Sequence, residues 1–339
     1  MTEHDSVAAF ALALPKAELH VHLEGSMWPS TLKALADKHE LADIPRTEDE
    51  LRRWFEFRDF DHFIEVYLTS IGVLRDPEDF ARLAYDSLTA LSAHNVRYTE
   101  MHVSLFGHLM RDVEAGVVFE GIEEGRRRAE AECGIVTRWI PDFPGDFGID
   151  AAERTLDAVL AHRTESIVGF GIGGVEVPRG EFADVFTRAT AAGLHSIPHA
   201  GETGGPDRMW SALRDLGAER IGHGIAAMAD PELVAHLVDH RIPLDVSPTS
   251  NIRTRVVETM DEHPLPAMID AGLVVTLNSD DPSMFGTDLT SEYLAAHRMG
   301  LDCTALQVLA LAAVDASFAE ESTKTSLRAD IAAVAVPDA

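Results

Sequence analysis

Short apolar runs rich in valine and isoleucine alternate with longer stretches of helical periodicity along most of the chain. The runs do not alternate strictly between apolar and polar residues, which is typical of parallel strands buried on both faces. Several of the intervening stretches begin at proline or an acidic residue and end near glycine, as helix start and stop signals do. Roughly eight strands, each followed by a helix, predict an α/β fold of the (β/α)8 TIM-barrel type.

The expected strands are Glu18–Leu23, Val96–Val103, Ile135–Ile140, Ile167–Ile172, His195–His199, Arg220–Gly222, Ile242–Val246 and Leu273–Asn278. The expected helices are Glu114–Cys133, Ala151–Arg163, Gly180–Ala192, Pro206–Leu216, Pro231–His240, Leu265–Ala271, Asp288–Arg298 and Thr304–Phe318, the last two being extra C-terminal helices. Residues 27–93 break the pattern with several helical segments and an aromatic-rich piece from Trp54 to Phe63. We interpret 27–93 as a helical insertion near the barrel mouth, either a lid or pocket wall or plain structural packing. The length of 339 residues fits one barrel, so we expect a single domain over 1–339.

The charge of the chain indicates which kinds of partner it can bind. Lys plus Arg is 28 and Asp plus Glu is 57, which gives a formal charge of 28 − 57 = −29. Such a surface repels nucleic acid and anionic lipid, so we expect neither as a partner and instead expect a small-molecule substrate. The two cysteines have no paired spacing, and the apolar run Val7–Leu14 has no basic lead-in typical of a signal peptide. We therefore expect a cytoplasmic protein with no membrane span, and the sequence leaves homo-oligomerisation open.

Histidines and carboxylates fall at the ends of the expected strands, which is where active sites of such barrels lie. His20 and His22 are two apart in a strand, so both side chains point to the same face. His199 ends the fifth strand, and Asp280 follows the last one. Buried neutral imidazoles need partners, and a divalent cation supplies one. The plain alternative is chance, since the chain has 16 histidines.

Three histidines and one aspartate leave a coordination position for water. Nitrogen and oxygen ligands without thiolate suit one zinc ion per chain, with manganese, iron or cobalt as alternatives. The ion would lower the pKa of the water toward neutrality. His223, in Gly222-His223-Gly224, could accept the proton of that water, and a protonated Glu202 could donate to the substrate. The plain alternative for Asp280 and Asp281 is helix capping, because Pro282 follows at a first-turn position.

Five motifs occur in one order along the chain: Pro15-Lys16-Ala17-Glu18-Leu19-His20-Val21-His22-Leu23-Glu24-Gly25, His199-Ala200-Gly201-Glu202, Gly222-His223-Gly224, Ser247-Pro248-Thr249-Ser250-Asn251 and Ser279-Asp280-Asp281-Pro282. Together they resemble the adenosine/adenine deaminase family, and the likeness runs from Leu14 to about Phe318. The resemblance implies a zinc-dependent hydrolase that replaces the 6-amino group of adenine with oxygen and releases ammonia.

The resemblance also implies a role for each matching residue. The zinc ligands would be His20, His22, His199 and Asp280. Glu202 would share a proton with purine N1, and His223 would orient or deprotonate the attacking water. Asp281 would contact both that water and N7, and the backbone of Gly174 would contact the N3 edge. Glu24 would lie near the 5′ end of a ribose.

The same motifs leave the substrate open. Adenosine-specific members of the family usually carry Asp where this chain has Glu24, and acidic residues where Gly171 and Val175 stand. Deaminases of free adenine resemble the Glu24 pattern, as do deaminases of enlarged adenosines such as aminodeoxyfutalosine, which carries an aryl carboxylate beyond the 5′ position. Arg253 and Arg255 could pair with that carboxylate, although solvation on the surface is the more ordinary role.

Other enzyme classes fit less well. Two-metal amidohydrolases use a modified lysine, and we expect none of Lys16, Lys33, Lys38 and Lys324 on an inner strand. Cytidine-type deaminases need a Pro-Cys-x-x-Cys run, which is missing. The glycines from Gly169 to Gly174 lack dinucleotide-loop spacing because position 176 is Glu. His102 could line the mouth of the pocket, but we interpret it as structural. The loss of a metal-ligating residue would indicate a non-catalytic binding protein on this scaffold, and none of these residues is lost.

Overall fold

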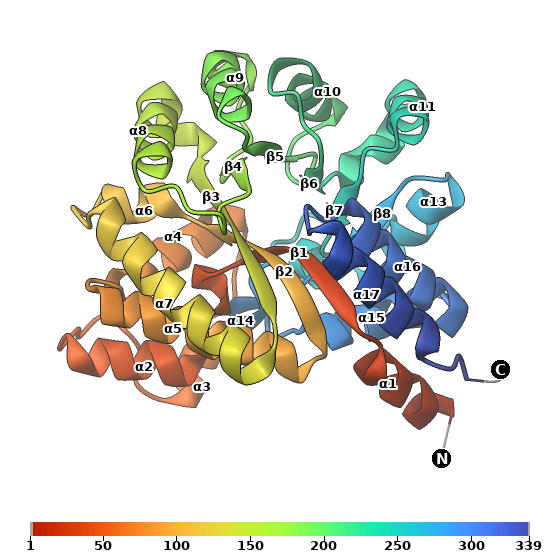
Figure 1. Ribbon diagram of the computed structural model, residues 1–339, viewed down its shortest axis with the longest axis horizontal. Coiled ribbons are helices and arrows are strands. Elements are labelled where there is room, and N and C mark those ends of the chain that lie inside the picture. The colour runs from red at the N-terminus through yellow and green to blue at the C-terminus, as the bar shows by residue number, and fades with distance from the viewer. Residues whose placement is uncertain (1–2, 338–339) are drawn as a thin grey trace.

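The computed structural model describes residues 3–337, and within them one parallel sheet of eight strands runs in the order β1 to β8 (Figure 1). Each strand pairs in parallel with the next along the chain. The prediction of a (β/α)8 TIM barrel is confirmed. The strands are β1 Lys16–His22, β2 Val96–Val103, β3 Val136–Pro144, β4 Gly169–Gly173, β5 His195–Ala200, β6 Ile221–His223, β7 Leu244–Val246 and β8 Val275–Leu277.

The seam between β8 and β1 closes through a few specific bonds. The His22 N–H donates to the Asp280 carbonyl at 2.7 Å, and the Asp280 N–H donates to the His20 carbonyl at 3.1 Å. Two residues before Asp280, the side-chain oxygen of Asn278 accepts hydrogen bonds from the N–H groups of Leu19 and His20 at 2.8 and 3.0 Å. A side chain thus satisfies backbone donors that a longer last strand would have paired.

The first strand begins two residues earlier than expected. Lys16 is its first residue and is fully buried, so the prediction that no lysine lies on an inner strand is wrong. Its ammonium donates to the carbonyls of Leu14 and His94, and burial lowers its pKa to about 7. His22, six residues on, is the last residue of the strand. Lys16 therefore lies at the opposite end of β1 from the predicted metal ligands.

Helices surround the sheet. Those before and within the insertion are α1 Glu3–Ala13, α2 Pro29–Lys38, α3 Glu48–Trp54, α4 Phe60–Ser70 and α5 Pro77–Ala93. Those between later strands are α6 Leu105–Leu109, α7 Ala115–Cys133, α8 Gly148–Ala161, α9 Ala183–Ala191, α10 Pro206–Asp215, α11 Pro231–His240, α12 Pro248–Arg253 and α13 Leu265–Asp270. After β8 come α14 Pro282–Phe285, α15 Leu289–Arg298, α16 Cys303–Ala316 and α17 Glu321–Ala333. The expected helices did not include α1, α6, α12, α14 or α17.

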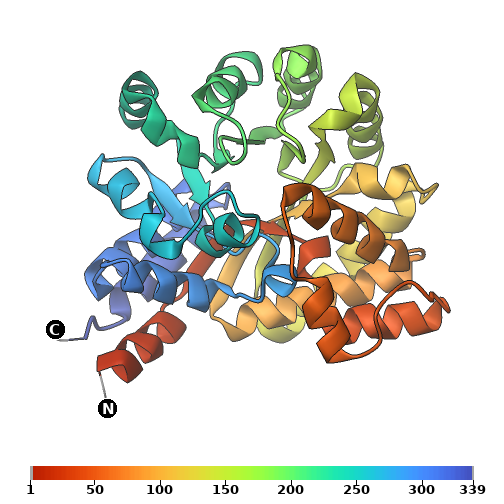
Figure 2. The ribbon, with the colours of Figure 1, turned by 180° about the vertical axis from the view of Figure 1, so that it is seen from behind.

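Within 27–93, α5 lies beside α7 and so occupies the place of a barrel helix (Figure 1). The two helices approach closely because α7 presents glycine to α5. A Cβ at Gly121 would lie 2.4 Å from the Pro77 carbonyl oxygen, and one at Gly125 would lie 2.5 Å from that of Ala81. The opposite view shows α2 to α4 on the side of the barrel that also carries α14 (Figure 2). Phe63 of α4 packs against Phe285 of α14, with ring centroids 5.2 Å apart.

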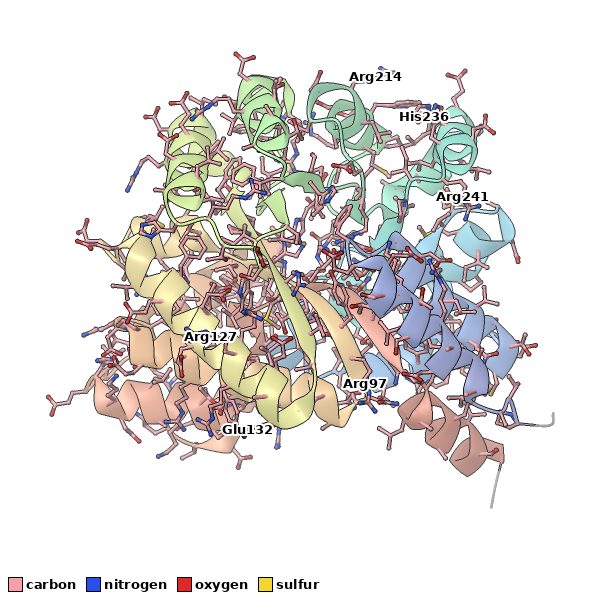
Figure 3. All side chains as sticks on the ribbon, viewed as in Figure 1. Arg97, Arg127, Glu132, Arg214, His236 and Arg241 are labelled. Carbon is pink, nitrogen blue, oxygen red and sulfur yellow. The ribbon has the colours of Figure 1, made fainter. Side chains whose placement is uncertain are left out.

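Charged side chains point outward from the helices that ring the barrel. Arg127 on α7, Arg214 on α10 and Arg241 after α11, labelled in Figure 3, are all exposed. Among the described residues, no helix has both the length and the apolar character needed to cross a membrane.

Candidate active site

A cavity opens where the carboxyl ends of the strands meet the insertion. About 800 Å³ of space not filled by atoms lies between its walls, open solvent at the mouth included. Its floor is polar and includes His22, His199, Glu202, His223 and Asp280. Its outer wall is apolar and comes largely from α4, namely Phe60, Phe63, Ile64 and Leu68, with Phe147 and Phe285 nearby. The insertion therefore forms one wall of the cavity.

Three of the four predicted metal ligands, His22, His199 and Asp280, lie on the cavity floor, and the fully buried His20 lies next to them. His22 Nε2 lies 3.1 Å from His199 Nε2, and Asp280 Oδ1 lies 3.4 Å from both His20 Nε2 and His22 Nε2. Ligands at ordinary zinc distances in tetrahedral array would lie about 3.4 Å apart. Both ring nitrogens of the fully buried His20 lack a hydrogen-bond partner among the described residues. The donor set and its spacing fit a divalent cation.

The backbone around these ligands fixes their orientation. His199 Nδ1 donates to the Ile172 carbonyl at 3.0 Å, which leaves a lone pair on Nε2 for a cation. Glycine provides the space for His20, because a Cβ at Gly222 would lie 2.6 Å from His20 Cε1. His223 and Asp280 have φ angles of 62° and 64°, in the left-handed region that non-glycine residues seldom adopt. Strained backbone of this kind clusters at functional sites.

Glu202 lies in a loop that a second carboxylate holds in place. Glu176 accepts hydrogen bonds from four consecutive backbone N–H groups, those of residues 201 to 204, at 2.7 to 3.2 Å. The Glu202 side chain lies 3.6 Å from His223 Nε2. Burial, and then the negative charges of Asp280 and Glu176, raise the pKa of Glu202 well above its usual range. The raised pKa favours the carboxylic acid form of Glu202, which is the form that can donate a proton.

His223 and Asp281 complete the polar floor. His223 Nε2 lies 3.8 Å from Asp280 Oδ2, and burial lowers the pKa of His223 to about 3. Asp281 makes no side-chain capping bond to α14, so the capping interpretation is wrong for Asp281. Its Oδ1 has no partner among the described residues, and burial beside Asp280 raises its pKa. A Cβ at Gly25 would lie 1.7 Å from this oxygen, so only glycine fits there.

Two further polar residues adjoin the cluster and were not assigned to the site from sequence. Asp142 on β3 lines the cavity and lies 3.8 Å from His22 Nδ1. His102 on β2 hydrogen-bonds Asp142 through Nδ1 at 3.2 Å, and its ring centroid lies 4.9 Å from those of His20 and His22. His102 thus belongs to the imidazole cluster. The signal available in the sequence was its position near the end of a strand.

The two predicted substrate contacts differ in position. Gly174 lines the cavity with a φ of 69°, and a Cβ there would lie 3.0 Å from Pro144 Cβ. Glu24 is fully buried behind the wall and is not among the residues that line the cavity. Burial is the largest influence on Glu24 and opposes its ionisation, but the hydrogen bond and charge of His108 and the backbone hydrogen bonds from Glu24 and Ser104 together lower the Glu24 pKa.

Arg253 and Arg255 bind the insertion. Arg253 Nη2 donates to the Phe55 carbonyl at 2.7 Å, and Arg255 Nε donates to the Phe57 carbonyl at 3.4 Å. Neither arginine lines the cavity, and none of the described residues that do is a lysine or arginine. The pairing of these arginines with a substrate carboxylate is therefore not supported.

Comparisons with known proteins identify the family of the chain. A sequence profile described as adenosine deaminase matches residues 15–334. An aminodeoxyfutalosine deaminase of Streptomyces avermitilis is 48% identical over 328 residues, 95% of this chain and 92% of the relative. The crystal structure of an adenine deaminase from Arthrobacter aurescens superposes with a TM-score of 0.91 at 34% identity, covering 94% and 98% of the two chains. An amidohydrolase from Burkhoderia ambifaria with bound Zn gives 0.89 at 29% identity, covering 98% and 93%. The chain belongs to the adenosine deaminase family.

Proposed function

We propose that this protein is a zinc-dependent hydrolytic deaminase that replaces the 6-amino group of an adenine nucleoside with oxygen and releases ammonia. The single observation that carries the proposal is the buried acid Glu202 beside His223, on the same cavity floor as His22, His199 and Asp280. Family membership and the names of the relatives support it. Zinc is supported by the related amidohydrolase with bound Zn.

The metal would be held by His20, His22, His199 and Asp280, whose donor atoms fit it. When bound, a divalent ion of this kind supplies acidity, because it lowers the pKa of a water molecule toward neutrality. His223 would orient that water and accept its proton, since its Nε2 lies 3.6 Å from Glu202 and 3.8 Å from Asp280.

Glu202 supplies the proton that the purine needs. Attack at C6 places negative charge on the ring nitrogens, so a donor at N1 stabilises the transition state more than the ground state. Asp281, whose Oδ1 has no partner among the described residues, faces N7. The backbone of Gly174 contacts the N3 edge. Together these groups fix the plane of the ring with C6 toward the metal ligands.

An adenosine with an enlarged 5′ group, such as aminodeoxyfutalosine, is the substrate that the cavity favours. The apolar wall of Phe60, Phe63, Ile64 and Leu68 offers contact to an aryl group beyond the sugar. No described lysine or arginine lines the wall, so no cationic side chain is available there to pair with the carboxylate of such a group. That carboxylate would instead be solvated by water at the open mouth. The relative at 48% identity is named as an aminodeoxyfutalosine deaminase.

Free adenine is the second candidate, and the observation in its favour is the TM-score of 0.91 with an adenine deaminase. A non-catalytic binding role is the third. It is disfavoured because all four residues proposed as metal ligands are present in the chain, and His22 Nε2 lies within 3.4 Å of both His199 and Asp280.

A direct assay tests the proposal. Ammonia release would be measured from adenine, adenosine and aminodeoxyfutalosine with the zinc-loaded protein, and again with Glu202→Gln. We expect the highest kcat/KM for a 5′-extended nucleoside and a loss of about 10²- to 10⁴-fold in kcat for the variant, because an amide cannot transfer the proton. Near-normal turnover by Glu202→Gln, or no ammonia from any of the three substrates, would refute the mechanism.

A further inference from the structure

The loop between β4 and α9 contacts the active site from behind the cavity wall. Gly174, at the start of the loop, lines the cavity, whereas Arg179, near its end, is fully buried and is not among the lining residues. Between them, Glu176 accepts hydrogen bonds from the N–H groups of residues 201 to 204. The loop therefore supports the segment after β5, which includes the proposed proton donor Glu202.

Arg179 binds the backbone of a proposed metal ligand. Its Nη2 donates to the His199 carbonyl at 2.7 Å. The His199 ring is bound separately, because its Nδ1 lies 3.0 Å from the Ile172 carbonyl on β4. Gly145 leaves the space that the guanidinium fills, since a Cβ there would lie 2.8 Å from Arg179 Nη1. Bonds to β4 and to the loop that follows it thus hold both the ring and the backbone of His199.

The other nitrogens of Arg179 indicate that this residue is not there for stability. Nε and Nη1 are buried and have no hydrogen-bond partner among the described residues. Burial lowers the pKa of Arg179 to about 10, and the negative charge of Glu176 opposes that shift. Buried donors without partners weaken a fold, and such groups are typical of positions that serve function. An apolar side chain of similar length would be at least as good for packing.

We propose that Arg179 is a positioning residue, which holds the backbone of His199 while Glu176 holds the residues that follow, an inference that rests on the proposed function. The two side chains come from one loop and act on one continuous segment, residues 199 to 204. Together they keep the proton donor Glu202 at a fixed place relative to the metal ligands. A misplaced proton donor lowers kcat more than it changes KM, because the proton is transferred in the transition state.

Arg179→Met removes the charge and the donors while keeping a long side chain. We expect kcat to fall by about 10- to 100-fold, the loss of one hydrogen bond from a charged donor, with KM changed by less than about threefold. The melting temperature of the zinc-loaded variant should not fall, because the two unpaired donors are removed as well. Arg179→Lys keeps a cationic donor and should recover part of kcat. Arg163→Met is the control, since the exposed Arg163 donates to the Gly193 carbonyl, just before the other end of β5.

Zinc affinity tests the same role without turnover. Groups that orient metal ligands usually contribute about 10- to 100-fold to metal affinity, and we expect Arg179→Met to lose about tenfold, since Arg179 bonds the backbone of the ligand and not its ring. Competition with a chelator measures this, and Arg163→Met should bind zinc as the wild type does. If the wild type released no ammonia, the proposed function would fail, and the zinc measurement would still decide the role of Arg179.

A double-mutant cycle tests whether the two side chains act together. Because both hold one segment, Arg179→Met combined with Glu176→Gln should lose less kcat than the product of the two single losses. Multiplicative losses would contradict the joint action. A lower melting temperature of Arg179→Met, with kcat and zinc affinity unchanged, would show that Arg179 only stabilises the fold and would overturn the proposal.

Discussion

The Glu202 N–H donates to Glu176 Oε1 at 2.7 Å, and the same carboxylate also accepts from the N–H groups of Gly201, Thr203 and Gly204. Four donors on one carboxylate convert a glycine-containing loop into a rigid support for the proposed proton donor. Glu176 also contributes negative charge that helps to raise the Glu202 pKa.

Replacing Glu176 with Gln should therefore impair catalysis. A glutamine accepts through one oxygen only and turns an N–H group toward donors that it cannot satisfy, so residues 201 to 204 shift. We expect kcat to fall by about 10- to 100-fold, the loss of one or two charged hydrogen bonds, with zinc content unchanged. Steady-state kinetics and elemental analysis measure this. The exposed Glu181→Gln is the matched control, and equal activity of the two variants would contradict the role.

Removing His20 should release the metal. Changes to residues that merely support a ligand already cost roughly 10–100-fold in metal affinity, so loss of a ligand should cost more. We expect His20→Ala to retain well below one equivalent of zinc after dialysis against a weak chelator, measured by elemental analysis. His240→Ala, at an exposed position on α11, serves as control. Full zinc occupancy in His20→Ala would show that it is not a ligand.

The barrel and its predicted metal ligands were accessible from sequence because their signals are local. The spacing of His20 and His22 in one strand, and the glycines on both sides of His223, can be recognised within a few residues of sequence. The contacts of Glu176 and Asp142 were not accessible, because each depends on which distant backbone or side chain the fold brings near. Arg253 illustrates the same limit: its position indicates a charged group near the site, but only the fold reveals that its partner is the Phe55 carbonyl.

Arg253→Ala tests the attachment of the insertion. Arg253 Nη2 bonds the Phe55 carbonyl, and the adjoining α4 supplies the apolar wall of the cavity. Without this bond the wall should close less firmly on substrate, so we expect KM to rise about tenfold with little change in kcat. Arg255→Ala is the control, because its contact is longer at 3.4 Å and the residue is exposed, and its effect should be smaller. A fall in kcat at unchanged KM would contradict this account.

A buried carboxyl far from catalysis should make stability depend on pH. Glu292 on α15 is fully buried, and desolvation raises its pKa to about 7 despite hydrogen bonds from Thr249 and Thr287. The folded protein thus binds this proton where the unfolded chain, with a pKa near 4.5, does not. The stability contributed by the protonated form is fully present below pH 4.5 and is lost as the pH rises through 7.

Glu292→Gln removes this titration, because glutamine resembles the protonated acid. We expect the free energy of unfolding of the wild type, relative to that of the variant, to fall as the pH rises from 4.5 through 7. The total fall should be at most about 3 kcal/mol. Urea unfolding at several pH values measures it, with the exposed Glu258→Gln as control. An unchanged difference between wild type and variant across this range would contradict the shifted pKa.

The close packing of α5 on α7 predicts that a single methyl group is destabilising there. A Cβ at Gly125 would lie 2.5 Å from the Ala81 carbonyl oxygen and 2.7 Å from Ala84 Cβ, and neither atom can move without shifting a helix. We expect Gly125→Ala to lower the free energy of unfolding by about 1–3 kcal/mol, even though alanine favours helix. Gly72→Ala has no atom within 4 Å of its new Cβ and should be neutral or slightly stabilising. Thermal unfolding of both variants separates the two effects, because loss of glycine flexibility alone would stabilise both, whereas a steric clash destabilises Gly125→Ala only.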